Sequence, residues 1–155
     1  MPTVKEIRDA IKAKILTVAD IGTVHTYQRY AKEASKFATL YKFGDPARIQ
    51  GWNISRVSTR ELLTDIDRHA VFHSWRIRGY MSLEDADATE ELFDTKIEQI
   101  RDAFRADDDL GDLIFSCVNP ESLEAGVQVL DQRPVLLAGV LCHHAELGLM
   151  TQHLE

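Results

Sequence analysis

Apolar residues recur at helical spacing near the start of the chain. Four of them stand three and four positions apart and would share one face of a helix: Val4, Ile7, Ile11 and Ile15. Thr3 and Glu6 have the spacing of a capping box, which marks a helix start. Gly22 ends the pattern, so we predict an amphipathic helix that stops near residues 20–22.

A longer helical pattern occupies the middle of the chain. Its apolar face repeats at intervals of three and four residues: Ala86, Thr89, Phe93, Ile97, Ile100 and Phe104. Ser82 and Asp85 again suggest a capping box at its start. The acidic residues 107–109 oppose a helix dipole at its C-terminal end, so the helix should stop just before them.

Period-two alternation predicts strands in the remaining segments. Residues 24–29, 50–62 and 70–81 alternate with β-branched and aromatic side chains, and the last two should form an antiparallel pair joined through residues 62–69. Further strands are expected at three places, separated by turns at Asn119-Pro120 and at Asp131 to Pro134. Their ranges are 112–118, 126–130 and 135–150.

These elements predict an α+β fold in which one mixed, mostly antiparallel β-sheet is packed on one face by the N-terminal helix and the long central helix. Residues 31–50 give no steady pattern and are expected to form an irregular excursion with some helix. No repeat or linker divides the 155 residues, so we expect a single domain over residues 1–155.

Composition narrows the classes of function. With 25 acidic and 18 basic residues the formal charge is −7, which argues against a surface built mainly to neutralise phosphates. Cys117 and Cys142 have neither metal-ligand nor disulfide-framework spacing, which favours a reduced, intracellular origin. The N-terminus lacks a secretory pattern, and the longest apolar run, residues 135–142, is too short to cross a bilayer.

The segment Val140 to Gln152 carries the densest cluster of reactive residue types. On a strand, Cys142, His144 and Glu146 project to one side, whereas His143 projects to the other, so the adjacent histidines cannot share one ion. A metal site built on Cys142, His144 and Glu146 would need ligands from elsewhere in the fold. The simpler interpretation is a half-buried strand whose apolar face holds Leu141, Leu147 and Leu149.

Other chemical candidates are weaker. His69 and His73 are spaced as zinc ligands on a helix, but in a strand they stand roughly 13 Å apart, and the glutamate of an HExxH motif is absent. Cys117 lies among apolar residues and is expected to fill the core. Arginines interleaved with aromatic residues, as in WRIRGY, could stack on nucleic acid, but cross-strand pairs or subunit contacts fit an acidic chain better.

The order of elements and a set of short motifs resemble the tail-terminator, or tail-completion, proteins of long-tailed bacteriophages. The motifs are Gly22, Val24, His25, Tyr27 and Arg29; Gly51-Trp52; His73, Trp75, Ile77, Gly79 and Tyr80; the stretch FDTKIEQIRDAFRADDDLG; and a C-terminal strand that ends in a polar tail. They span most of the chain, although residues 31–50 align with no feature of that family.

The resemblance implies a structural virion protein without catalysis or cofactor. Such a subunit forms a homo-oligomeric, hexameric ring on the tail tube protein, stops tube growth and offers a surface to head–tail connector proteins, with no membrane and no sequence-specific nucleic acid involved. It would act in the host cytoplasm during assembly and in the virion afterwards. A head–tail connector or stopper subunit remains the nearest alternative, and a small metal-dependent hydrolase a more distant one.

Strand arginines and their neighbours are the expected interface residues. Arginines placed on strands rather than on solvated helix faces are candidates for contacts between subunits or with the tube, although they could equally be ordinary exposed side chains. The candidates are Arg56, Arg76, Arg78, Tyr27 and Arg29.

Overall fold

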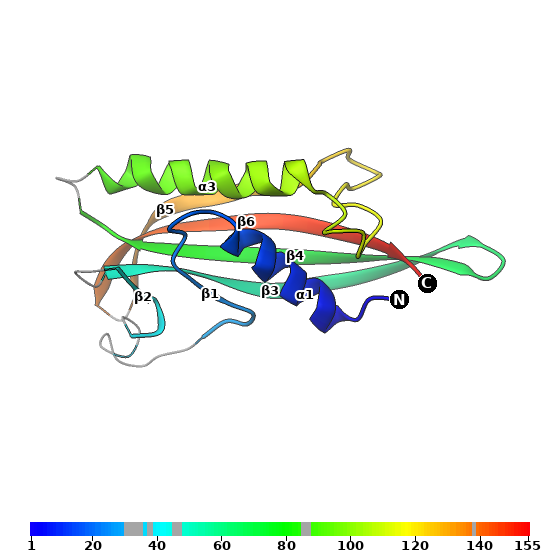
Figure 1. Ribbon diagram of the computed structural model, residues 1–155, viewed down its shortest axis with the longest axis horizontal. Helices are drawn as coiled ribbons and strands as arrows, with labels where there is room; N and C mark the ends of the chain where they lie inside the picture. Colours follow the sequence, from blue (N-terminus) through cyan, green and yellow to red (C-terminus); the bar gives the residue numbers. More distant parts are fainter. Residues whose placement is uncertain (30–35, 37–38, 45–47, 85–87, 138) are drawn as a thin grey trace.

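A six-stranded mixed sheet with two helices packed against it forms the fold, which confirms the predicted α+β class (Figure 1). The structure is a computed structural model and describes residues 1–29, 36, 39–44, 48–84, 88–137 and 139–155. Its elements are α1 (Val4–Leu16), β1 (Thr23–His25), β2 (Lys42–Phe43), β3 (Arg48–Asp65), β4 (Arg68–Ser82), α3 (Thr89–Ala106), β5 (Gln128–Leu137) and β6 (Val140–Leu154). The expected helical part of residues 31–43 lies largely outside the described residues.

Helix α1 forms where the apolar spacing predicts it. Ile7, Ile11 and Ile15 are fully buried, and the capping box is present: the Glu6 N–H donates to Thr3 Oγ1 at 3.1 Å, and the Thr3 N–H donates to the Glu6 carboxylate at 2.6 Å. The helix ends at Leu16, earlier than predicted. Gly22, with φ +97°, belongs to the connection that leads into β1.

Helix α3 buries its predicted apolar face but begins later than the sequence suggests. It starts at Thr89 after Ala88, which has φ 51° and no side-chain cap. Ser82 is the last residue of β4 and does not cap a helix. Its hydroxyl instead accepts a hydrogen bond from the Ile49 N–H at 2.8 Å, which ties β4 to β3. Residues 85 and 86, which the prediction also used, lie outside the described residues.

Strands β3 and β4 form a hairpin that is longer than predicted. Pairing continues from Gln50↔Met81 to Asp65↔Arg68, so most of the expected connection at residues 62–69 is strand. Figure 1 shows the hairpin extending beyond the helices. We call residues 58–73 of this hairpin the arm. Strand β3 also includes residues 48–50, which the sequence assigned to the irregular excursion.

The C-terminal strands differ from the prediction in two ways. Residues 112–118 form turns with two isolated bridges, Ser116 to Gln152 and Val118 to Ala125, instead of a strand. Residues 131–134, expected as a turn, lie inside β5, and the chain reverses between Leu137 and Val140 instead. Gly139 has φ +81° at this reversal, a conformation that glycine adopts without steric cost.

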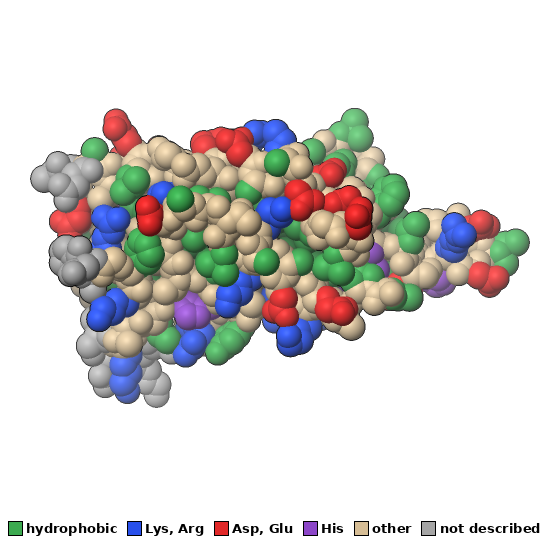
Figure 2. All heavy atoms as spheres, in the orientation of Figure 1, with side chains coloured by type: hydrophobic (Ala, Val, Ile, Leu, Met, Phe, Trp, Pro, Cys, Tyr) green, Lys and Arg blue, Asp and Glu red, His purple; other side chains and the backbone are tan. Residues whose placement is uncertain are grey.

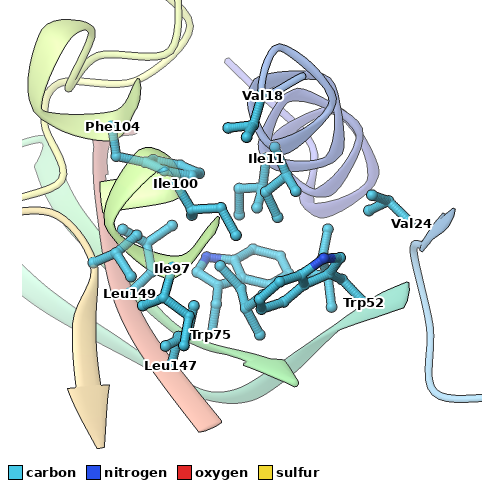
Figure 3. Close-up of a cluster of buried hydrophobic side chains, with 14 of the residues drawn as sticks. Ile11, Val18, Val24, Trp52, Trp75, Ile97, Ile100, Phe104, Leu147 and Leu149 are labelled. Carbon is cyan, nitrogen blue, oxygen red and sulfur yellow. The ribbon is translucent and has the colours of Figure 1, made fainter. Parts of the chain in front are cut away.

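Both helices cover the same face of the sheet, which we call the helix face. Its core places Trp52 and Trp75 beneath Ile11, Ile97 and Ile100 (Figure 3). The Trp52 indole N–H donates to the Ile21 carbonyl at 2.9 Å. On the opposite face, which we call the open face, the described residues form a small buried cluster of Tyr41, Ile49, Tyr80 and Cys142. One face is therefore packed by helices, as predicted.

Candidate functional site

The adjacent histidines of β6 point to opposite faces of the sheet. His143 lies on the helix face, where its Nε2 is 2.8 Å from the Thr89 hydroxyl at the start of α3. His144 lies on the open face, where its ring stacks on Tyr80 at 4.8 Å and its Nδ1 donates to the Gly79 carbonyl at 3.1 Å. Burial lowers the pKa of His144, which favours the neutral ring.

The other members of the predicted cluster have separate roles. Cys142 is fully buried beside Tyr80, and burial raises the pKa of its thiol to about 11. Glu146 instead lies 3.3 Å from Arg78 and 3.8 Å from Arg76. Within the part of the chain that the structure describes, no three His, Cys, Asp or Glu side chains are placed to hold a metal ion.

The expected apolar face of β6 is only partly buried. Leu147 and Leu149 are buried against α3, whereas Leu141 is 50% exposed. Leu141 pairs with Leu136 beside the β5–β6 turn, and Leu136 is itself 69% exposed. The sequence therefore predicted correctly to which face the side chains of this strand point, but not how deeply each one is buried.

The second histidine pair is also divided. His69 is half exposed and its Nδ1 lies 2.7 Å from Glu61 Oε1. His73 is 3% exposed and its Nδ1 lies 2.8 Å from the Thr59 hydroxyl. The two histidines therefore have different partners on β3.

Two of the predicted interface arginines come together at the centre of the open face. Arg76 and Arg78 flank Glu146 from the neighbouring strand, and their side chains are 31% and 26% exposed. Arg56 is exposed but pairs across the hairpin with Trp75, a residue of the helix face. The structure thus separates Arg56 from the other two.

Tyr27 and Arg29 follow β1 instead of forming part of it. The strand predicted for residues 24–29 ends at His25. The Arg29 guanidinium lies over the Tyr27 ring at 5.3 Å, and Tyr27 is 54% exposed. Burial raises the pKa of Tyr41 while Arg29 opposes this rise, so Arg29 lies close to the open-face cluster.

Sequence reasoning missed the part of the open face that β5 supplies. Strand pairing aligns Arg78, Glu146 and Asp131 in one row across three strands. Arg133, the next open-face residue of β5, pairs with His144 and lies 3.2 Å from Asp131. Proline and aspartate suggested a turn here, although the alternation of Asp131, Arg133 and Val135 was already the signal of a strand.

An open pocket of about 560 Å³ lies between the start of α3 and the β5–β6 hairpin. Glu90, Glu91 and Asp94 give it an acidic wall, while Arg133 lines it from β5. The Thr89 hydroxyl lies 2.8 Å from His143 Nε2 and also accepts a hydrogen bond from the Glu84 N–H at 3.0 Å. The acidic wall favours a cation over an anion.

Both borders of the sheet have unpaired backbone. Within the described residues, β3 has no outer partner over residues 54–65, and β5 has none over 128–137. The β5 border is interrupted by a bulge between Val129 and Asp131 and by Pro134, which lacks an N–H. The β3 border contains no proline, but its pairing with β4 also shifts register between Arg56 and Ser58 and between Leu63 and Asp65.

The arm adds exposed apolar surface next to that border. Leu62, Leu63 and Ile66 are 41%, 67% and 89% exposed. In Figure 2 the arm projects from the body with an apolar tip between charged side chains. Exposed aliphatic side chains on a projecting hairpin are typical of a contact surface.

No protein-family model matches the chain, and no curated protein matches it. Among the described residues, no helix is both long and apolar enough to cross a membrane.

Proposed function

We propose that this protein is a structural subunit that assembles head to tail into a closed ring, and that the ring is a phage tail terminator. The observation that carries the proposal is the pair of unpaired borders on opposite sides of one sheet. A contact between two different surfaces of identical subunits closes into a ring when the rotation between them allows it.

The directions of the two border strands suit such a contact. Each neighbouring pair in the order β3, β4, β6 and β5 is antiparallel, so β3 and β5 run in opposite directions. When a second copy lies beside the first in the same orientation, its β5 meets β3 in antiparallel pairing, which a continuous sheet across the interface requires.

The neighbouring copy must also be displaced along the strands. Residues 48–49 and 51–53 of β3 are already paired with β2 and β1, which leaves residues 54–65 for the partner. Within one subunit, Asn53 and Asp131 lie in the same row across the sheet. Pairing beyond residue 53 therefore shifts each copy towards the arm, and a closed sheet needs such a stagger.

The positions of charged and exposed apolar side chains indicate which residues of β3 lie opposite which residues of β5 of the neighbouring copy. Arg60 and Leu62 lie on the open face of β3, as Asp131 does on β5. Placing Arg60 opposite Asp131 of the partner subunit sets Ser58 opposite Arg133 of the partner subunit. It also brings Leu62 towards the exposed Leu130 of the partner subunit, which lies on the open face at the bulge of β5. In the single subunit Arg60 pairs with Glu121 at the surface, a contact that costs little to exchange.

The remaining predicted residues lie where a ring could contact other components. Arg76 and Arg78 face outwards from the centre of the open face, and Tyr27 and Arg29 lie beside its small buried cluster. We assign these four residues to contacts with the tail tube protein or the head–tail connector. Arg56, on the other face of β3, is placed at the border between copies.

The assignment is tested by light scattering coupled to size exclusion, followed by negative-stain imaging with and without cognate tail tubes. We expect six-fold rings that cap one end of the tubes and shorten the tubes grown in their presence. Rings that cap heads instead would support the connector alternative. A protein that stays monomeric alone and leaves tube length unchanged would contradict the proposal.

The open-face arginines provide the matched variant. Arg76→Gln with Arg78→Gln removes the outward charge without placing new carboxylates beside Glu146, as glutamate would. We expect rings that form normally but cap fewer tubes. Wild-type capping by this variant would remove both arginines from the tube contact.

A further inference from the structure

Two imidazole rings are buried against each other where the end of β6 meets the arm. The ring centroids of His73 on β4 and His153 on β6 are 5.3 Å apart, and the residues are 3% and 4% exposed. Both lie on the helix face, away from the open-face surface described above. The proposed ring contacts do not use them.

The hydrogen bonds around the pair favour uncharged rings. His73 Nδ1 is joined to the Thr59 hydroxyl, which serves a neutral ring as donor or acceptor. His153 Nδ1 is buried without a hydrogen-bond partner. The carboxylate beside His153 belongs to Glu155, at 3.7 Å from Nε2, which is longer than a hydrogen bond.

Charged groups near the pair come from each strand beside it and from α1. Strand β3 contributes Arg56 and Glu61, and β4 contributes His69, which is paired with Glu61. Helix α1 contributes Arg8, whose guanidinium lies 5.7 Å over the Trp75 ring next to His73. Two cations thus stand near the pair, while Glu61 is already engaged.

These surroundings depress the pKa of His73. Burial is the largest cause, His153 and Arg56 add to it, and Glu155 alone among the named groups opposes it. A positive charge on either ring would lie in a poorly solvated site beside another imidazole.

We propose that the His73–His153 pair is an acid-operated latch that holds the end of β6 on the arm. When both rings are neutral they pack together, and Val71↔His153 and His73↔Thr151 complete the ladder. When a ring takes up a proton, the charge is hydrated only if this strand end leaves β4. The last rungs of the ladder, the two backbone hydrogen bonds between His69 and Glu155, the bond from the Trp75 indole to Thr151 and the contact of Gln152 with residues 115–116 must open.

The sign of the pH effect follows from the depressed pKa of His73. In the open state, in which the end of β6 has left β4, His73 has the ordinary pKa of 6.5. In the closed state, in which this strand end is paired, His73 takes up a proton only at lower pH. The open state therefore binds more protons below pH 6.5, and closure is favoured fully above it. As the pH falls from 6.5 towards the pKa of the closed state, the opening constant rises up to about tenfold per pH unit for one histidine.

Hydrogen exchange tests the latch directly. Amide protection of residues 150–155 is compared at pH 7.5 and 5.5 after correction for the intrinsic exchange rates. We expect wild-type protection to fall at the lower pH, by at most about tenfold. In His73→Gln, whose amide can still bond to Thr59 but cannot become charged, most of this fall should disappear.

The control histidine lies on the same arm. His69→Gln removes a half-exposed ring that is paired with Glu61, so the loss of protection should persist. His153→Gln provides a second test if His73→Gln does not fold. Equal wild-type protection at both pH values, or an unchanged pH response in both latch variants, would overturn the proposal. The measurement reads strand opening, so its result does not depend on ring formation.

Discussion

Gly79 shows how one residue allows the two central strands to share a large core side chain. It stands opposite Trp52 in the hairpin, and a Cβ at this position would lie 2.2 Å from the Trp52 ring. The ring has little room to retreat, since Trp52 is 1% exposed, bonds to the Ile21 carbonyl and packs on Phe93 at 5.6 Å. The absence of a side chain at Gly79 is therefore a packing requirement.

We predict that Gly79→Ala lowers the free energy of unfolding by about 1–3 kcal/mol, the usual cost of overpacking a core. Urea unfolding followed by circular dichroism measures the change. Gly148→Ala on the adjacent strand is the control, because its Cβ would meet the exposed side chain of Leu130 at 3.0 Å, which can swing aside. Equal midpoints for the two variants would contradict the packing argument.

For single residues, the sequence predicted to which face of the sheet a side chain points. It did not predict whether a distant segment of the chain covers that side chain. Alternation along β6 placed His143 and His144 on opposite faces, as the structure shows. It could not show that Cys142 is covered by Tyr41, because that contact brings together segments about a hundred positions apart in the chain. The pairing of His73 with His153 was missed for the same reason.

At the scale of elements, an ion pair connects the end of α1 to the turn after α3. Lys14 contacts the Asp107 carboxylate, and the two side chains are 18% and 31% exposed. Asp107 also accepts a hydrogen bond from the Gly111 N–H at 3.0 Å. The Lys14 hydrogen bond is the largest cause that lowers the pKa of Asp107 to about 2.

We predict that Asp107→Asn reduces the free energy of unfolding at pH 7 by no more than about 1 kcal/mol, as expected of a partly exposed pair. Because the folded pKa lies below the ordinary 3.8, this contribution is complete above pH 3.8 and is lost as the pH falls through about 2. Urea titrations at several pH values should show the difference from wild type shrinking over that range. Asp108→Asn, an exposed neighbour, should give no such pattern.

Helices and strands could be predicted where the apolar periodicity continued over many residues. Where the periodicity was short, the type of element was ambiguous. The buried faces of α1 and α3 and the pairing of β3 with β4 followed from periodicity alone. Residues 112–118 are apolar enough for a strand, but among them only Ser116 bridges to β6, at Gln152, beyond the residues of β6 that pair with β5. The capping pattern at Ser82 failed because pairing with β6 extended β4 through that residue.

At the scale of the whole molecule, the borders of the sheet favour assembly of identical copies, whereas the net charge opposes it. Two borders of unpaired backbone favour addition of another strand, whereas a formal charge of −7 on each copy makes identical copies repel. Specific contacts must offset that repulsion. Alternation in the sequence predicted the sheet, but the length of the arm depended on pairing that continued past Leu62 and Leu63.

The proposed register can be fixed by a disulfide between copies. Cys117 and Cys142 are buried, and burial raises the pKa of their thiols to about 12 and 11, so engineered surface cysteines should react first. Ser58→Cys with Arg133→Cys places one thiol on each side of the proposed interface. Under mild oxidation we predict a ladder of linked oligomers on non-reducing gels, ending at the size of the ring.

Each single variant is the matched control, because it carries only one half of the contact and should give no ladder beyond a dimer. Shifting the second cysteine to Gln128, at the far end of β5, should also abolish the ladder, since that position lies too far along the strand in this register. If the double variant links no more than the single ones while rings are still seen by imaging, the ring is held by surfaces other than β3 and β5.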